Sequence, residues 1–137
     1  EPDSEEKRHR ITILNDAYKS NPLSARSAVE AFSRMKGARK VIIFGDMKEL
    51  GGRSEELHRE LGRRIALAGA DTVVAVGPES RVLAGEVAGC LHVERVEDLQ
   101  ERLPGLVKPG DLLLLKGSRA VGLERVVKYI GEMVHGE

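Results

Sequence analysis

The chain has 137 residues, a common size for one domain with a single hydrophobic core. Lysine plus arginine and aspartate plus glutamate number 22 each, and this zero formal net charge gives no support to a general nucleic-acid-binding or membrane-surface role, since both need excess positive charge. One cysteine, Cys90, excludes an intramolecular disulfide, and no apolar run could span a bilayer, so a cytoplasmic setting is expected.

Charged side chains dominate the start of the chain, and we interpret 1–10 as a linker or frayed start and 11–137 as one domain. Short apolar runs then alternate with longer segments of helical period. Because aromatic residues are scarce, Val, Leu, Ile and Ala must fill the core, as they do in parallel sheets covered on both faces. The predicted strands lie at 11–14, 41–44, 72–76, 91–93 and 112–115.

Amphipathic segments between these runs predict helices. Asn21 followed by Pro22 is typical of a helix start, and so is Ser54 followed by two glutamates. The helical candidates, with the two weaker ones last, lie at 25–35, 57–68, 123–134, 79–88 and 97–103. The alternation of strand and helix predicts an α/β fold: an open, mostly parallel, Rossmann-like sheet with helices on both faces.

In such a sheet ligands bind beyond the carboxyl ends of the strands, so the loops that follow the strands are the candidate sites. The loop after the first strand contains Asp16, Tyr18, Lys19 and Asn21. A carboxylate there can accept hydrogen bonds from ribose hydroxyls, the tyrosine ring offers a stacking surface, and the lysine offers positive charge. A well-capped turn explains the same residue types equally well.

The loop 45–52 after the second strand is rich in glycine, and its Asp46 and Glu49 are able to bind an ammonium group or a metal. A solvated surface turn is the simpler interpretation of this loop. His58, on the following helix, is interpreted as a packed or surface residue rather than a ligand or base. The loop after the third strand, beginning at Gly77, is interpreted as a turn and little more.

The loop after the last strand, 116–124, opens an amphipathic helix. Lys116, Ser118, Arg119 and the backbone N–H groups of the helix start form a candidate anion site, and an arginine suits a carboxylate because it donates two parallel hydrogen bonds.

The glycine spacing of this loop partly matches a phosphate-binding loop. Gly117 and Gly122 occupy the two glycine positions, but Leu123 and Glu124 replace the required lysine and serine or threonine. No other segment supplies that loop, a dinucleotide fingerprint, a nucleophile elbow or a histidine-rich metal motif. The chain alone therefore lacks the parts of a phosphoryl-transfer enzyme.

Three of these loops, taken in order, resemble motifs of Mur-type ATP-dependent amide ligases, most of all the MurF type that adds D-alanyl-D-alanine to UDP-N-acetylmuramoyl-tripeptide in peptidoglycan synthesis. Residues 15–22 resemble Asp-x-Tyr-Asn-Ala-Asn-Pro and 45–51 resemble Gly-Asp-Met-x-Glu-Leu-Gly. Residues 116–119, followed by Gly122 and 124–126, resemble the Lys-Gly-Ser-Arg segment near the carboxy terminus. Lys19 and Ser20 depart from the family, which has Asn and Ala there.

The resemblance implies the third, carboxy-terminal domain of a cytoplasmic ligase that works through an acyl phosphate and is inactive without its other domains. ATP and Mg would be bound mainly by a central domain outside this chain, and the partners would be upstream Mur ligase domains in cis, D-alanyl-D-alanine and UDP-muramoyl tripeptide. It implies no catalytic or metal-ligating residue here. The implied nucleotide-side residues are Asp16, Tyr18, Lys19 and Asn21. The implied substrate-side residues are Ser118, Arg119, Lys116, Asp46 and Glu49.

Two alternatives share this fold. One is a stand-alone small-molecule-binding or interaction module, which would have a tight ligand of its own. The other is the equivalent domain of a sibling ligase for another amino acid or for folate polyglutamylation, against which the loop 45–51 argues.

Overall fold

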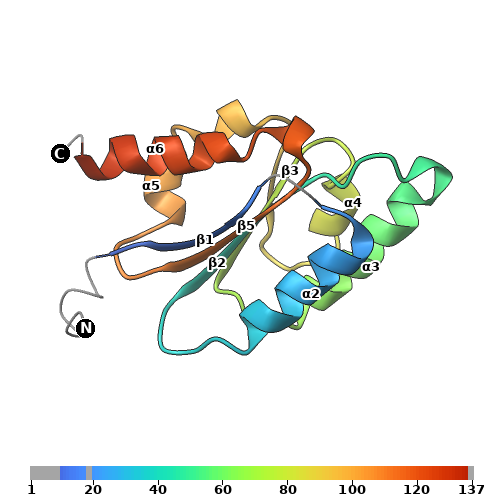
Figure 1. Cartoon of the computed structure of the whole chain (residues 1–137), viewed down its shortest axis with the longest axis horizontal. Coiled ribbons are helices and arrows are strands. Elements are labelled where there is room, and N and C mark those ends of the chain that lie inside the picture. Colours follow the sequence, from blue (N-terminus) through green and yellow to red (C-terminus); the bar gives the residue numbers. More distant parts are fainter. Residues whose placement is uncertain (1–9, 18–19, 136–137) are drawn as a thin grey trace.

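The computed structural model describes residues 10–17 and 20–135. Five parallel strands form one sheet in the order β1-β5-β2-β3-β4 (Figure 1). The strands are β1 (Thr12–Asp16), β2 (Lys40–Gly45), β3 (Thr72–Val76), β4 (Leu91–Val93) and β5 (Leu112–Lys116). All five predicted strands are confirmed, with bounds that shift by at most two residues, and in the described part of the chain the sheet is wholly parallel.

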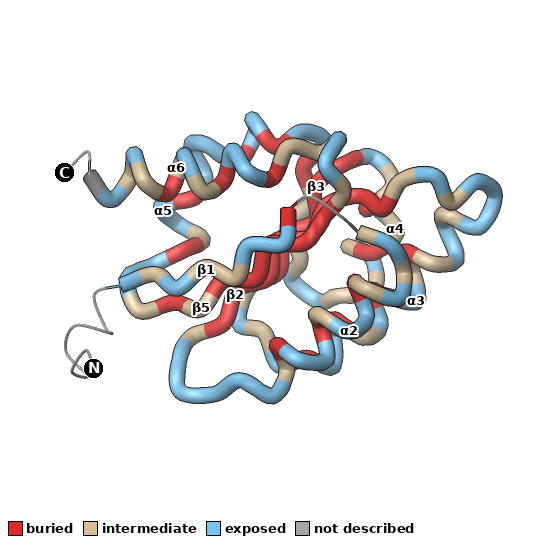
Figure 2. The backbone as a smooth tube through the Cα atoms, in the orientation of Figure 1, coloured by how far each residue is buried: buried red, intermediate tan, exposed pale blue. Residues whose placement is uncertain are grey.

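Two hydrophobic clusters, one on each face of the sheet, explain why the strand sequences are continuous apolar runs. Successive side chains of a strand point to opposite faces, so Val41 and Ile43 belong to one cluster while Ile42 and Phe44 belong to the other. Every residue of β2 is buried, and Figure 2 shows the central strands as the most buried part of the molecule. A polar residue within this strand would be buried on either face.

Helices cover both faces, as predicted (Figure 1). One face is covered by α2 (Pro22–Ser33), α3 (Ser54–Ala66) and the short α4 (Arg81–Ala84), whose apolar side chains share a cluster with Phe44. The other face is covered by α5 (Leu103–Leu106) and α6 (Glu124–His135), which pack on Ile43. The remaining short 3₁₀ segments are η1 (Gly51–Arg53), η2 (Val96–Leu99) and η3 (Arg119–Val121).

Helix α2 begins as its sequence predicts. The Asn21 side chain accepts a hydrogen bond from the Ser24 backbone N–H at 2.9 Å, and the Ser24 hydroxyl accepts one from the Asn21 N–H at 3.2 Å. Helix α3 does begin at Ser54, but no side chain caps it. The Ser54 hydroxyl instead donates to Glu79, a residue of the loop after β3.

The two weaker helix predictions are wrong in extent. Of 79–88 only α4 is α-helical, since glycines follow it and Gly89 adopts a left-handed φ of 74°. Of the segment 97–103, residues 97–99 belong to the 3₁₀ turn η2, residues 100–102 form a turn, and α5 starts only at Leu103. Pro104 in the first turn of α5 explains the new start, because proline lacks the N–H that a continuing helix would need.

The register of the sheet brings the carboxyl ends of the strands to one edge. Asp16 lies beside Lys116, Phe44 beside Lys116, and Gly45 beside Val76. The predicted linker lies outside the described residues except for Arg10, whose carbonyl accepts from the Gly110 N–H at 2.9 Å. No helix within residues 10–17 and 20–135 has the length and apolar character needed to cross a membrane.

Candidate functional site

A cavity of about 400 Å³ opens at the carboxyl edge of the sheet. It lies between the loops that follow β2, β3 and β4 on one side and the loop from β5 to α6 on the other. Charged side chains and backbone of these four loops line it. The chemically functional lining residues are Asp46, Lys48, Glu94, Arg95, Glu97, Arg119, Glu124 and Arg125.

Asp46 ties three of these loops together. Its side chain is fully buried, and its carboxylate accepts from the backbone N–H groups of Ser80 at 2.7 Å and Glu79 at 3.2 Å. Its own N–H donates to the Val76 carbonyl, and its carbonyl accepts from the Ser118 N–H at 3.2 Å. With its oxygens engaged in this way, Asp46 orders the loops around the cavity rather than presenting a free carboxylate.

Gly77 makes room for that carboxylate. Its φ is +112°, which disfavours any side chain, and an added Cβ would lie 2.4–2.5 Å from the carboxylate atoms of Asp46. The interpretation of this loop as a mere turn is therefore wrong. Two N–H groups that follow Gly77 are donors to Asp46, so the loop shape and the aspartate depend on each other.

Lys48 and Glu79 extend the network toward solvent. The ammonium group of Lys48 lies 3.2 Å from Asp46 Oδ2 and 3.1 Å from Glu79 Oε2, and Ser54 donates to Glu79 Oε1 at 2.6 Å. The Ser54 hydrogen bond lowers the pKa of Glu79; partial burial opposes it and Lys48 reinforces it. Burial by itself lowers the pKa of Lys48, but the hydrogen bonds to Glu79 and Asp46 outweigh it, so that pKa is raised.

We expect Glu79→Gln to destabilise the fold at neutral pH but not in acid. The folded-state pKa of Glu79 lies below its ordinary value of 4.5, so its contribution is complete well above pH 4.5 and is lost as the pH falls through the folded-state pKa. Melting temperatures of both chains against pH should converge on acidification. Glu60→Gln is the matched control, since Glu60 is exposed without an ion pair among the described residues. A difference that stays constant with pH would contradict the assignment.

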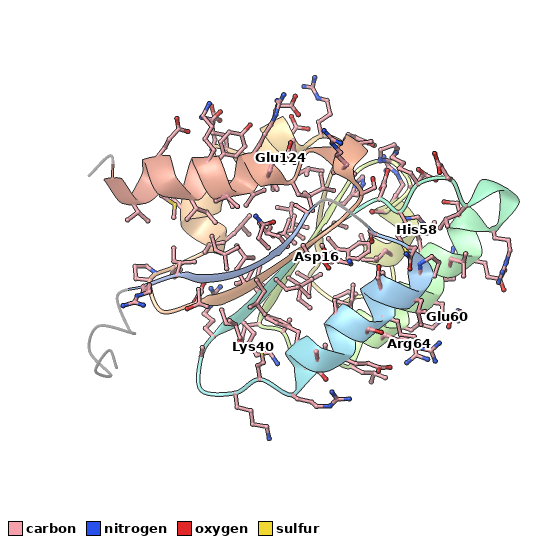
Figure 3. All side chains as sticks on the ribbon, viewed as in Figure 1. Asp16, Lys40, His58, Glu60, Arg64 and Glu124 are labelled. Carbon is pink, nitrogen blue, oxygen red and sulfur yellow. The ribbon has the colours of Figure 1, made fainter. Side chains whose placement is uncertain are left out.

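His58 is a packed structural residue, as its position suggested. It is fully buried on α3, where Figure 3 places it beside the loop after β2. Its Nε2 accepts from the Met47 N–H at 2.9 Å and its Nδ1 donates to the Ser54 carbonyl at 2.8 Å, which identifies the neutral tautomer protonated at Nδ1. The histidine thereby fixes the backbone just after Asp46.

The loop after β5 approaches the loop after β2 very closely. An added Cβ on Gly117 would lie 2.8 Å from the Leu123 side chain and 3.1 Å from backbone atoms of Gly45, the last residue of β2, so a larger residue would crowd this contact. The Ser118 hydroxyl is buried and has no hydrogen-bond partner among the described residues. Arg119 is exposed and lines the cavity. Ser118 is not among the residues that line the cavity, so of these two side chains Arg119 is the one placed to bind a small anion there.

Lys116 does not reach the cavity. Its side chain is 1% exposed, and its ammonium group lies 2.5 Å from Asp16 Oδ2, whose side chain is 51% exposed. Figure 3 shows Asp16 at the end of β1. Lys116, which the sequence predicts as a substrate-side residue, therefore contacts Asp16, which it predicts as a nucleotide-side residue. This contact orients the Asp16 carboxylate.

The other predicted site residues have different outcomes. Tyr18 and Lys19 lie outside the described residues. The side-chain oxygen of Asn21 accepts the hydrogen bond that caps α2. Glu49 is exposed, has a left-handed φ of 62°, and is not among the residues that line the cavity.

Sequence reasoning missed several residues of this edge as site residues. Glu79 lies in the loop after β3, which was interpreted as a turn, and Glu94 follows β4, whose loop the rule that ligands bind beyond strand ends would have included. Glu124 opens α6; its sequence position was noted in the last loop and in the resemblance, but no role in the site was assigned to it.

Comparisons with known proteins agree with the geometry. A family model described as "Mur ligase, glutamate ligase domain" matches residues 4–119. The UDP-N-acetylmuramoyl-tripeptide–D-alanyl-D-alanine ligase of Bacillus subtilis is 32% identical over 129 residues, which is 89% of this chain and 28% of that protein. The enzyme of the same name from Escherichia coli is 34% identical over 122 residues, covering 88% of this chain and 27% of that protein.

Solved structures give the same result. The MurF ligase of Thermotoga maritima in complex with ADP is similar with a TM-score of 0.79 and 33% identity, over 92% of this chain and 29% of that one. A MurF structure from Acinetobacter baumannii is similar with a TM-score of 0.76 and 27% identity, over 89% of this chain and 27% of that one. The chain thus spans little more than a quarter of the length of these relatives.

Proposed function

The chain belongs to the Mur ligase family, glutamate ligase domain, and we propose that it is the carboxy-terminal domain of an ATP-dependent ligase that joins D-alanyl-D-alanine to UDP-N-acetylmuramoyl-tripeptide. The relatives that cover most of the chain carry that enzyme's name, which supports the proposal. The observation that carries it is the cavity at the sheet edge, which the exposed Arg119 lines.

The reaction proposed for the whole protein has two steps. The tripeptide carboxylate takes the terminal phosphoryl group of ATP, which gives an acyl phosphate and ADP. The dipeptide amine then attacks the acyl carbon, losing a proton as phosphate leaves, and an amide forms. Because this chain has no phosphate loop, its own part is to bind and orient reactants, which contributes to rate by positioning.

Asp16 is the residue we assign to the nucleotide. Its half-exposed carboxylate stands at the end of β1, and Lys116 holds one oxygen, so the other is available to accept from vicinal ribose hydroxyls. Asn21 can contribute only its amide N–H₂, since its oxygen caps α2. The proposal for Tyr18 and Lys19 rests on sequence alone.

Magnesium is assigned to the rest of the ligase. Within the described ranges no group of three or more His, Cys, Asp and Glu side chains is arranged to hold a metal ion. This donor set does not fit a magnesium site, and we derive no step through the metal in this domain.

Arg119 is assigned to the carboxylate of the dipeptide. The guanidinium group can donate two parallel hydrogen bonds to a carboxylate, whereas the Ser118 hydroxyl, which the sequence offers as a further donor, is buried and does not line the cavity. Asp46 positions this loop, because its carbonyl accepts a hydrogen bond from the Ser118 N–H and so holds the loop against the end of β2. Glu49 is proposed to shape the loop after β2.

We expect Arg119→Ala to raise the dipeptide KM by about a hundredfold, since one partner of a charge-assisted pair is removed. The assay measures ADP release by the longest natural chain that contains this segment, with ATP, magnesium, UDP-muramoyl tripeptide and D-alanyl-D-alanine. Arg102→Ala is the matched control, because Arg102 is exposed and does not line the cavity.

ADP release that does not depend on the dipeptide would contradict the proposed substrate. An unchanged dipeptide KM in the Arg119 variant would contradict the role of that residue. If the longest natural chain is no longer than this one and releases no ADP, a stand-alone binding module is the better description.

A further inference from the structure

Most of the charged side chains that line the cavity pair with another charge of the protein, but two have no such partner among the described residues. Six of the cavity's eight charged side chains form ion pairs, whereas Arg119 and Glu124 have neither an ion pair nor a side-chain hydrogen bond within the described part of the chain. The six, each with its partner, are Asp46 and Lys48 together, Glu97 and Arg125 together, Glu94 with Arg81, and Arg95 with Asp98. The cavity therefore presents one uncommitted cation and one uncommitted anion.

These two side chains flank the same short loop. Arg119 begins η3, Glu124 begins α6, and Gly122 between them has a left-handed φ of 78°. A Cβ added to Gly122 would lie 4.0 Å from Glu124 Oε1, so the carboxylate is close to this glycine at the wall of the cavity. Figure 3 shows Glu124 at the start of α6.

Capping of α6 does not account for Glu124. The N–H groups of Arg125 and Val126 already donate to the carbonyls of Gly122 and Leu123 at 3.0 and 2.9 Å. A carboxylate in the first turn gains a modest interaction with the helix dipole, but that interaction requires no position in a cavity wall. The second, opposite charge on the same wall is what distinguishes Glu124 from an ordinary helix-start acid.

We propose that Glu124 binds the ammonium group of the small zwitterion whose carboxylate Arg119 binds. Under the proposed function, on which this inference rests, that zwitterion is the free dipeptide. A receptor with one cation and one anion selects molecules that carry both termini, and it disfavours an amine-blocked peptide, which leaves Glu124 unpaired. Glu124 is thus a specificity-determining residue that orients the amine before it attacks.

The experiment compares wild type with Glu124→Gln in the full-length ligase. The neutral amide has nearly the same size, so the dipeptide KM should rise about tenfold, the value of a charge-assisted hydrogen bond, while the ATP KM stays unchanged. Inhibition by N-acetyl-D-alanyl-D-alanine is the second measurement. Wild type should bind the dipeptide much more tightly than this amine-blocked analogue, and the variant should lose most of that preference.

Glu132→Gln is the matched control, because Glu132 is an exposed acid on the same helix that does not line the cavity. Equal dipeptide KM values in wild type and Glu124→Gln would overturn the inference even if Arg119→Ala remains impaired. So would an undiminished preference over the acetylated analogue. Wild-type protein that releases no ADP in response to the dipeptide would instead overturn the proposed function.

Discussion

Gly77→Ala is expected to lower the free energy of unfolding by about 4 kcal/mol, the sum of backbone strain and overpacking. The strain arises because φ at this position is +112°. The overpacking arises because the new methyl group would lie within 2.5 Å of the Asp46 carboxylate, which is buried and has no free direction to move. Urea unfolding of the two chains measures the difference, with an unchanged m-value as the check on two-state behaviour.

Gly69→Ala separates the two causes. Gly69 also has a left-handed φ, of 72°, but an added Cβ there has nothing within 4 Å. Its substitution should cost about 1 kcal/mol, from backbone strain alone. If both alanines prove equally destabilising, the contact between residue 77 and Asp46 is not the reason for the glycine.

Asp46→Ala is the second change with a large expected effect, about 3 kcal/mol in the free energy of unfolding. It leaves the backbone N–H groups of Glu79 and Ser80 without their acceptor and removes one of the two anions beside Lys48. Asp46→Asn should also destabilise, because an amide N–H₂ placed at Oδ2 would face the Glu79 N–H. Urea unfolding measures both variants.

Asp98→Ala serves as the control for Asp46. Asp98 is exposed and accepts one backbone hydrogen bond, from the Arg95 N–H at 3.2 Å. Its loss should cost less than about 1 kcal/mol, since water replaces the partner. An Asp46→Ala chain as stable as Asp98→Ala would show that the buried carboxylate does not hold the loops together.

Much of the architecture follows from local pattern. Apolar runs such as 72–76 predict buried strands because a strand between two helical layers has no polar face, and the stripe of α3 predicts a helix covering one layer. Asn21 predicts the start of α2 because its capping bond involves only neighbours in sequence. The weaker helices failed where glycine and proline interrupt the pattern, at Gly89 and Pro104.

The location of the candidate site was also accessible from sequence, because parallel strands bring their carboxyl ends to one edge. That rule selected the loops of Asp46 and Arg119, which line the cavity, and the loop of Asp16, which does not. The loop after β3, which contains Glu79, was interpreted as only a turn, and the loop after β4, which contains Glu94, was not considered. Family membership was predicted from three short motifs and is confirmed by the family match over residues 4–119.

What each polar side chain does at that edge was decided only by tertiary structure. Lys116 and Asp16 are a hundred residues apart and meet because β5 lies beside β1, so the lysine is buried and unavailable to the cavity. Asp46 depends on the φ of Gly77, and Glu124 is distinguished by lining the cavity with Arg119, the other charged side chain that makes no ion pair among the described residues. Residue type and local period determine which elements form, whereas the pairing of charges depends on which distant loops the strand order brings together.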